Sequence, residues 1–224
     1  MKSMKRHACQ TVIFDLDGTL IDSSPSILEC FKRVLEEANL QPVVPLDNSM
    51  IGPPLRRTLE NLTGLPDGDA LERLAANFRS IYDMEGYTAT RVYSGVEDLL
   101  SKLASHEIPM AIATNKRRTP TLKILEHLGW EQYFRIVGTL DTPLIPHADK
   151  GALIGWVVDE IRADAGTSLY LGDKREDGEA AAANGMPFIA AGWGYGNWDG
   201  AEMPADWHLI RSPYELTEQL ENRF

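Results

Sequence analysis

Five short apolar runs alternate with amphipathic stretches along most of this chain. The amphipathic stretches place residues such as Leu99, Leu100 and Leu103 at the three-to-four spacing of a buried helix face. Because strands that alternate with helices usually pair in parallel, this order predicts an α/β fold, a Rossmann-like three-layer core with a parallel sheet. The predicted strands are 11–15, 108–114, 135–139, 168–172 and 187–191, and the predicted helices are 96–106, 118–129, 150–163 and 177–184.

One long interval interrupts this alternation. It contains no convincing strand, but helical patterns occur at 26–39, 54–63 and 69–84. We therefore expect a core domain made of 1–21 and 91–224, and an inserted α-helical domain made of 22–90. Ser23, Ser24 or Ser26 are expected to cap the first helix of the insertion, and Asp67 or Asp69 the third.

The first apolar run ends in Asp15-Leu16-Asp17-Gly18-Thr19. Residues two apart in a strand point the same way, so Asp15 and Asp17 are expected to leave the sheet together, with Gly18 permitting a tight turn. Two adjacent carboxylates repel each other and usually need a cation or a shared proton. This pattern favours a metal-assisted reaction with a carboxylate nucleophile. The alternative is a polar turn without chemistry, since Asp and Gly are common turn residues.

Two other predicted strands also end in polar residues. The run at 108–114 leads into Thr114-Asn115-Lys116, which offers donors to a phosphoryl oxygen or simply caps a helix. The run at 168–172 leads into Asp173, with Asp177 four residues later. Ligands of open α/β sheets bind beyond the carboxyl ends of the strands, so these residues are expected to meet Asp15.

Oxygen ligands of this kind suit Mg²⁺, although acids at the start of a helix are more often solvated. Lys150 begins the predicted helix 150–163 and offers a positive charge near the four acids. Taken singly, a lysine at this position is usually solvated.

Composition and charge exclude several functions. The net charge of −11 argues against a nucleic-acid or anionic-membrane surface, both of which reward basic patches. It leaves a small anionic substrate open, because a metal ion can reverse the sign of the charge in one cleft. No apolar run approaches the length of a membrane span, and no signal-peptide pattern is evident, so a cytoplasmic protein is expected.

These motifs, taken in order from Asp15 to Asp177, resemble those of the haloacid dehalogenase superfamily, and the helical insertion resembles its C1-type cap. The resemblance covers nearly the whole chain. Three further segments resemble the phosphoglycolate phosphatase-like branch of that superfamily: Ile51-Gly52-Pro53-Pro54-Leu55, Thr114-Asn115-Lys116 and Trp193-Gly194-Tyr195-Gly196.

The resemblance implies a role for each motif residue. Asp15 attacks phosphorus and forms an aspartyl-phosphate, while Asp17 protonates the leaving group and later activates water. Mg²⁺ is coordinated by Asp15, Asp173 and the backbone carbonyl of Asp17, with Asp177 supporting the site. The phosphoryl group is bound by Thr114, Asn115 and Lys150. The family's lysine is commonly followed by proline, whereas Gly151 follows here, so Lys116 is the alternative to Lys150.

The implied activity is Mg²⁺-dependent hydrolysis of a small phosphomonoester, with phosphoglycolate as the first candidate. A nucleotide, a sugar phosphate and pyrophosphate are the next candidates, and a phosphomutase of the same fold is the nearest rival. A dehalogenase or a non-catalytic binding module fits less well. Arg56 and Arg57 are candidates for contact with a substrate anion, or else face solvent. A monomer and a homodimer are both compatible with the sequence.

Overall fold

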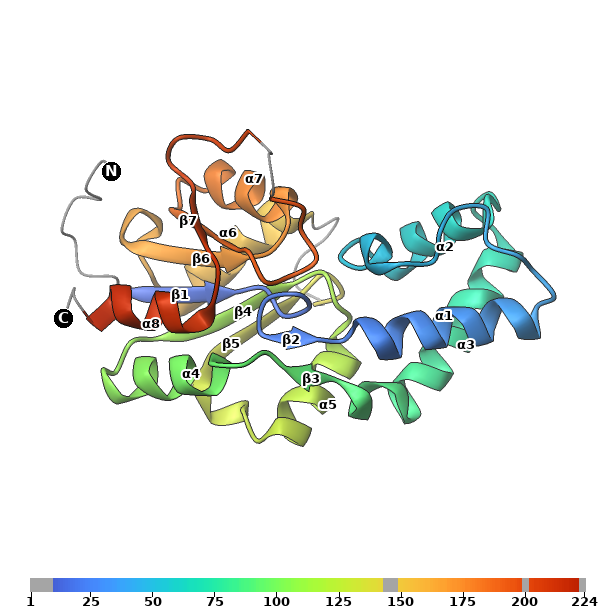
Figure 1. The fold of residues 1–224 in the computed structure, drawn as a ribbon, viewed down its shortest axis with the longest axis horizontal. Coiled ribbons are helices and arrows are strands. Elements are labelled where there is room, and N and C mark those ends of the chain that lie inside the picture. The colour runs from blue at the N-terminus through green and yellow to red at the C-terminus, as the bar shows by residue number, and fades with distance from the viewer. Residues whose placement is uncertain (1–9, 143–148, 199–201, 222–224) are drawn as a thin grey trace.

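The computed structural model describes residues 10–142, 149–198 and 202–221. At its centre is a six-stranded sheet in the order β5-β4-β1-β6-β7-β8, in which every neighbouring pair is parallel (Figure 1). The α/β class predicted from the alternation is therefore confirmed. The strands are β1 (Thr11–Phe14), β4 (Met110–Thr114), β5 (Phe134–Thr139), β6 (Ser168–Gly172), β7 (Phe188–Ala191) and β8 (His208–Ile210).

β1 lies in the middle of the sheet and is buried on both faces. Val12 is paired with Met110 of β4 on one side and with Leu169 of β6 on the other. Its apolar run is continuous because a parallel strand covered on both faces has no solvent side. The carboxyl end of β1 consequently lies between the carboxyl ends of β4 and β6, where the polar motifs begin.

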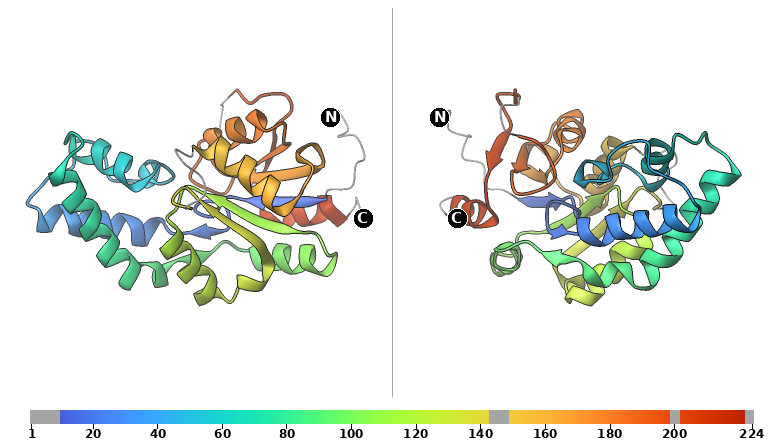
Figure 2. Two further views of the ribbon diagram at one scale, coloured as in Figure 1. Left: turned by 180° about the vertical axis from the view of Figure 1, so that it is seen from behind. Right: turned by 45° about the vertical axis from the view of Figure 1, so that its right-hand side comes forward.

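Helices cover the two faces of the sheet with separate hydrophobic clusters. On one face, Val12 and Phe14 pack with α4 (Val96–Ser105), α5 (Arg118–Leu128) and α8 (Pro213–Glu221). On the other, Ile13 packs with α6 (Lys150–Ile161) and α7 (Arg175–Ala183). Adjacent residues of β1 thus enter opposite clusters, as strand geometry requires. Figure 2 shows the two helical layers on either side of the sheet.

A bundle of three helices lies beside the sheet and has its own hydrophobic cluster (Figure 1). It consists of α1 (Ser24–Glu37), α2 (Leu55–Thr63) and α3 (Asp69–Met84). At its centre the rings of Phe31 and Phe78 are 4.5 Å apart, and those of Phe78 and Tyr82 are 5.5 Å apart. The chain enters and leaves this bundle through β2 (Ile21–Asp22) and β3 (Arg91–Val92), which pair antiparallel. The sequence analysis did not predict these two strands.

Short 3₁₀ helices complete the described chain: η1 (Asn48–Met50), η2 (Gly86–Ala89), η3 (Glu131–Tyr133) and η4 (Ala165–Thr167). In the described segments no helix combines the length and the apolar character needed to span a membrane.

Of the helix caps expected in the insertion, Ser23 is confirmed as the N-cap residue of α1, and the expected cap of α3 is wrong. Ser23 precedes α1 but makes no side-chain capping hydrogen bond, because its hydroxyl donates to Asp17 instead. Gly68 precedes α3, also without a side-chain cap, and Asp67 accepts hydrogen bonds from Arg56. At the start of α1 the side chain of Asp22 accepts from the backbone N–H of Ser24 at 3.0 Å instead.

Candidate active site

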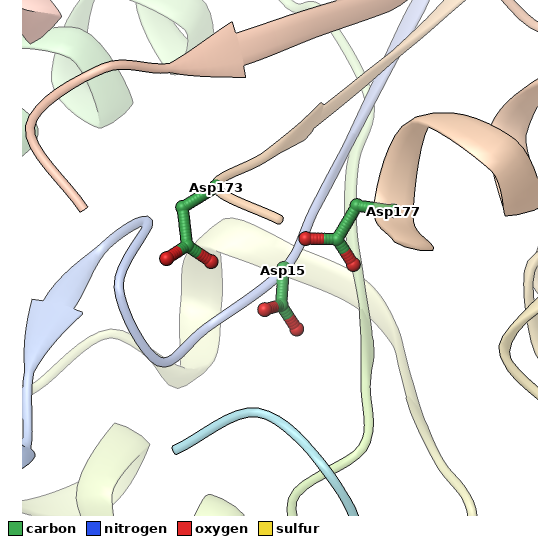
Figure 3. Close-up of side chains that lie close together, drawn as sticks. All are labelled: Asp15, Asp173 and Asp177. Carbon is green, nitrogen blue, oxygen red and sulfur yellow. The ribbon is translucent and has the colours of Figure 1, made fainter. Parts of the chain in front are cut away.

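The polar residues of the predicted site meet at the carboxyl ends of three central strands. Asp15 follows β1, Thr114 ends β4 and Asp173 follows β6. Lys150 is the first residue of α6 and Asp177 lies in the first turn of α7. Figure 3 shows Asp15, Asp173 and Asp177 gathered at one place from these separate elements. The sheet order alone explains this meeting, because β1 has β4 and β6 as its neighbours.

The three acids form a compact, buried cluster. Asp15, Asp173 and Asp177 each contribute one carboxylate oxygen, and these oxygens lie within 4.8 Å of one another. Burial raises the pKa of Asp15 to about 6, against the opposing effect of Lys150. Burial, together with the charges of Asp177 and Asp15, raises the pKa of Asp173 well above its usual range. The site therefore favours either protons or a bound cation.

Lys150 neutralises part of this cluster. Its Nζ donates to Asp15 Oδ1 at 2.8 Å and lies 3.0 Å from Asp177 Oδ1. Burial opposes the charge of Lys150, but the two aspartates raise its pKa well above the usual value. When all three carboxylates are ionised, the three acids and this one ammonium together carry a net charge of −2. A divalent cation would balance the cluster.

The donor set fits a hard cation such as Mg²⁺. All three clustered side chains offer carboxylate oxygens, the ligand type that Mg²⁺ prefers. One oxygen of Asp173, Oδ2, accepts a hydrogen bond of 2.7 Å from the backbone N–H of Tyr195. Its other oxygen, Oδ1, is buried and has no hydrogen-bond partner in the described part of the chain. An oriented carboxylate with one free buried oxygen is the arrangement expected of a metal ligand.

The glycine-rich loop after β7 holds Asp173 in place. Trp198 Nε1 donates to the backbone carbonyl of Asp173 at 2.9 Å. A side chain at Gly194 would collide with the carbonyl of Gly18, and one at Gly196 with the carbonyl of Asp173. These glycines therefore permit the loop to pack directly on the backbone of the site.

Tyr195 joins this loop to the start of the helical bundle. Its hydroxyl donates to Asp22 at 3.0 Å and accepts hydrogen bonds from the backbone N–H groups of Ser23 and Ser24, at 2.9 and 3.1 Å. Its own backbone N–H binds Asp173. Tyr195 was noted in the sequence only as part of a family-like segment, and the sequence contains no signal for its contact with residues about 170 positions earlier.

Asp15 and Asp17 have different surroundings although only Leu16 separates them. Asp17 accepts hydrogen bonds from Lys116 Nζ, at 3.0 Å to Oδ1 and 3.1 Å to Oδ2, and a short one from the hydroxyl of Ser23. Asp15 contacts Lys150. The two lysines considered in the sequence analysis therefore bind different aspartates. Only Lys150 contacts the carboxylate expected to act as nucleophile.

Thr114 and Asn115 line the same pocket as Asp15 and Asp17. The Thr114 hydroxyl accepts a hydrogen bond of 3.2 Å from the backbone N–H of Lys116. Asn115 Nδ2 donates to the carbonyl of Gly52, in the bundle, at 3.0 Å, and its buried Oδ1 has no partner among the described residues. Asn115 thus connects the sheet to the bundle at the edge of the pocket.

The pocket itself lies between the sheet and the bundle and has a volume of about 70 Å³. Its sheet side is polar and its bundle side is apolar. The sheet side is lined by Asp15, Asp17, Thr114, Asn115, Lys116 and Arg117, and the bundle side includes Ile27, Phe31, Ile51, Leu55, Phe78 and Tyr82. The pocket therefore has a polar wall with charged groups facing an apolar wall.

The structure does not bring Arg56 and Arg57 into this pocket. Both are exposed, and neither is among the lining residues. Arg56 forms ion pairs with Asp67 and with Glu72, the latter at 2.7 Å. The residues of the bundle that do face the pocket are mainly apolar.

Comparison with known proteins agrees with this site. Residues 12–191 match the model of the family described as haloacid dehalogenase-like hydrolase, which spans more than half of the chain. The fold and the site define an α/β protein with buried acids gathered at one edge of a parallel sheet. The chain belongs to the haloacid dehalogenase-like hydrolase family.

Individual relatives carry two different names. A phosphoglycolate phosphatase of Xanthomonas campestris pv. campestris (strain 8004) is 32% identical over 220 residues, covering 93% of this chain and 95% of that protein. The tyrosine-protein kinase PtkA of Mycobacterium tuberculosis (strain H37Rv) is 31% identical over 191 residues, covering 85% of this chain. The match spans only 64% of the kinase. A crystal structure of a predicted phosphatase from Clostridium acetobutylicum matches 96% of this chain and all of its own, with a TM-score of 0.82 and 27% identity.

The substitution Asp173→Asn should stabilise the metal-free protein and abolish its stabilisation by Mg²⁺. The pKa of Asp173 is raised in the fold, so its ionised form destabilises the folded state at neutral pH. An uncharged amide removes this repulsion. We expect a gain of roughly 1 kcal/mol, about 2–4 °C in Tm for a chain of this size. Thermal unfolding in EDTA and in Mg²⁺ measures both effects, with the exposed Asp69→Asn as the control. An undiminished response to Mg²⁺ would contradict a ligand role for Asp173.

Binding of Mg²⁺ should weaken as the pH falls through about 6, the value to which burial raises the pKa of Asp15. Protons and the cation compete for the same carboxylate oxygens, so protonation removes both a ligand and its charge. Calorimetric titration with Mg²⁺ from about pH 5 to about pH 8 measures the effect. An affinity that does not change over that range would argue against Asp15 as a ligand.

Proposed function

We propose that this protein is a Mg²⁺-dependent phosphomonoester hydrolase that acts on a small phosphorylated metabolite. The observation that carries the proposal is the cluster of Asp15, Asp173 and Asp177 with Lys150, next to a small pocket, in a chain of the haloacid dehalogenase-like hydrolase family. Phosphoglycolate is the first candidate substrate, because a relative 32% identical over nearly its whole length is named phosphoglycolate phosphatase.

In the proposed reaction, a carboxylate oxygen of Asp15 attacks phosphorus and the bond from phosphorus to the leaving oxygen breaks. Asp17 donates a proton to that oxygen, so the leaving group departs as an alcohol. A water molecule then attacks the phosphoryl group on Asp15 while Asp17 accepts its proton. Cleavage of the acyl phosphate releases inorganic phosphate and restores both aspartates. The different partners of Asp15 and Asp17 support this division of roles.

Mg²⁺, held by Asp15, Asp173 and the backbone carbonyl of Asp17, with Asp177 beside it, would neutralise charge on the phosphoryl oxygens. Lys150 orients Asp15 through its 2.8 Å hydrogen bond and supplies a positive charge. The hydroxyl of Thr114 and the amide of Asn115 are the proposed donors to the phosphoryl oxygens, since both residues line the pocket.

We propose that residues 22–90 act as a cap over a core made of 1–21 and 91–224. Residues of both parts line the pocket, and Asn115 binds the carbonyl of Gly52 across it. A closed cap would keep bulk water from the phosphoryl group.

Similarity to PtkA favours a second candidate, transfer of the γ-phosphoryl group of ATP to a tyrosine hydroxyl. PtkA is named a tyrosine-protein kinase, but the matched part is 64% of its length. The alternatives from the sequence, a phosphomutase, a nucleotidase or pyrophosphatase, a dehalogenase and a non-catalytic binding module, remain separable by the same experiment.

The test is release of phosphate from about a hundred phosphorylated metabolites, with Mg²⁺ and with EDTA, a breadth chosen because a fold does not determine its substrate. Parallel assays test the alternatives: ATP with a tyrosine peptide for a kinase, a sugar monophosphate with its bisphosphate for a phosphomutase, and a haloacid without metal for a dehalogenase. We expect metal-dependent release from small esters, above all phosphoglycolate. Phosphotyrosine without phosphate release would favour the kinase instead, and no activity in any assay would contradict an enzymatic role.

Replacing Asp15 with asparagine should lower kcat at least about a thousandfold, because the amide is a poor nucleophile. Wild-type protein quenched in acid during turnover should carry one phosphoryl group on Asp15 in peptide mass spectra. The Asp15→Asn protein should carry none, and the control Asp69→Asn should behave as wild type. Phosphorylation at another residue would refute the assignment of the nucleophile.

A further inference from the structure

Two cationic side chains line the described part of the pocket, and they have different partners. Arg117 binds Asp83 of α3 through both terminal nitrogens, at 2.9 and 2.5 Å. Lys116, whose side chain is only 6% exposed, is paired instead with Asp17, which also lines the pocket. Of the two cations, Lys116 is therefore the one beside the proposed proton donor.

Lys116 is held between the two sides of the pocket. Its Nζ lies 3.0 and 3.1 Å from the oxygens of Asp17 and donates to the Tyr82 hydroxyl at 3.0 Å. It also lies over the Tyr82 ring, 4.7 Å from the centroid. Tyr82 belongs to α3 and is 1% exposed, with its ring stacked on Phe78. A buried aromatic residue of the bundle thus fixes the position of a charge on the sheet side.

The bundle wall facing Lys116 offers no charge of its own. Its lining side chains include Ile27, Phe31, Ile51, Leu55 and Phe78. In such surroundings an anionic group without a cationic partner is strongly disfavoured, while one that reaches a lysine is bound more strongly than in water. Lys116 can therefore discriminate between charged and neutral leaving groups.

We propose that Lys116 is the specificity-determining residue that binds an anionic group on the leaving group of the substrate, and that Tyr82 is its positioning residue. This inference rests on the proposed phosphomonoester hydrolysis. Because Lys116 contacts both oxygens of Asp17, the proposed proton donor to the leaving oxygen, a carboxylate one carbon from that oxygen lies within its reach. The substrate class is a small phosphorylated hydroxy acid. Arg56 and Arg57 take no part in this recognition.

The test compares phosphoglycolate with isobutyl phosphate, in which two methyl groups replace the carboxylate oxygens. We consider the ratio of kcat/KM for phosphoglycolate to kcat/KM for isobutyl phosphate. An effect of the substitution on Asp17 alters both values and cancels in this ratio, so the ratio reports recognition of the charge. In Lys116→Met the ratio should fall about 10- to 100-fold, the usual value of a hydrogen bond to a charged group. Lys116→Arg keeps the positive charge and should retain most of the wild-type ratio. Lys123→Met, which removes a lysine outside the pocket lining, is the matched control and should leave the ratio unchanged.

Tyr82→Phe keeps the ring and removes the hydroxyl that accepts from Lys116. It should raise KM for phosphoglycolate about threefold to tenfold, in the range of one hydrogen bond, while kcat for isobutyl phosphate changes little. A purely structural role of Tyr82 would instead affect both esters alike. Equal ratios in wild type and Lys116→Met would refute the proposal while leaving the hydrolase function intact.

A binding measurement keeps the inference testable if neither ester is hydrolysed, which would contradict the proposed function. In the Asp15→Asn background, calorimetry measures the dissociation constants of phosphoglycolate and isobutyl phosphate without turnover. The proposal is supported if the protein binds phosphoglycolate more tightly than isobutyl phosphate and if Lys116→Met abolishes this preference. No preference, or one that Lys116→Met leaves intact, overturns it.

Discussion

The structure of this site depends on the negative charge concentrated at the ends of β1 and β6. Phe14 of β1 is paired with Leu171 of β6, so the acids that follow each strand meet at one edge of the sheet. Three carboxylates and one lysine are buried there together, an arrangement that destabilises the fold until a cation or protons compensate it. The same arrangement of buried carboxylates suits a hard cation, which connects the cost in stability to the proposed chemistry.

The second constraint is the separation of Asp15 from Asp17. Asp15 points to the acid cluster and Lys150, while Asp17 points to Lys116 and Ser23, beside the bundle. A nucleophile must be ionised and a proton donor must be placed at the leaving oxygen, so the two roles need different surroundings. Since Ser23 directly precedes α1 and Tyr82 belongs to α3, the position of Asp17 depends on the bundle lying against the sheet.

The sequence was sufficient to predict the parallel sheet and the strand ends that carry the polar motifs, because continuous apolar runs and helical spacing are local signals. It did not reveal β8, whose His208–Ile210 is too short and mixed, or the pair β2 and β3, each two residues long. It also did not reveal the contacts of Ser23, Tyr82 and Tyr195 with the site. Those contacts join residues distant in the chain, and residue type alone carries no distance information. For the same reason Arg56 was a candidate for contact with a substrate anion, until its ion pairs with Asp67 and Glu72 were seen.

The most direct test of the central claim is a crystal structure of the protein with Mg²⁺ and beryllium trifluoride, which mimics a phosphoryl group on a carboxylate. The account predicts beryllium bound to Asp15, and Mg²⁺ at about 2.1 Å from oxygens of Asp15 and Asp173, with Lys150 beside the fluoride atoms. Mg²⁺ bound away from Asp173, or a beryllium trifluoride group on any other side chain, would contradict it.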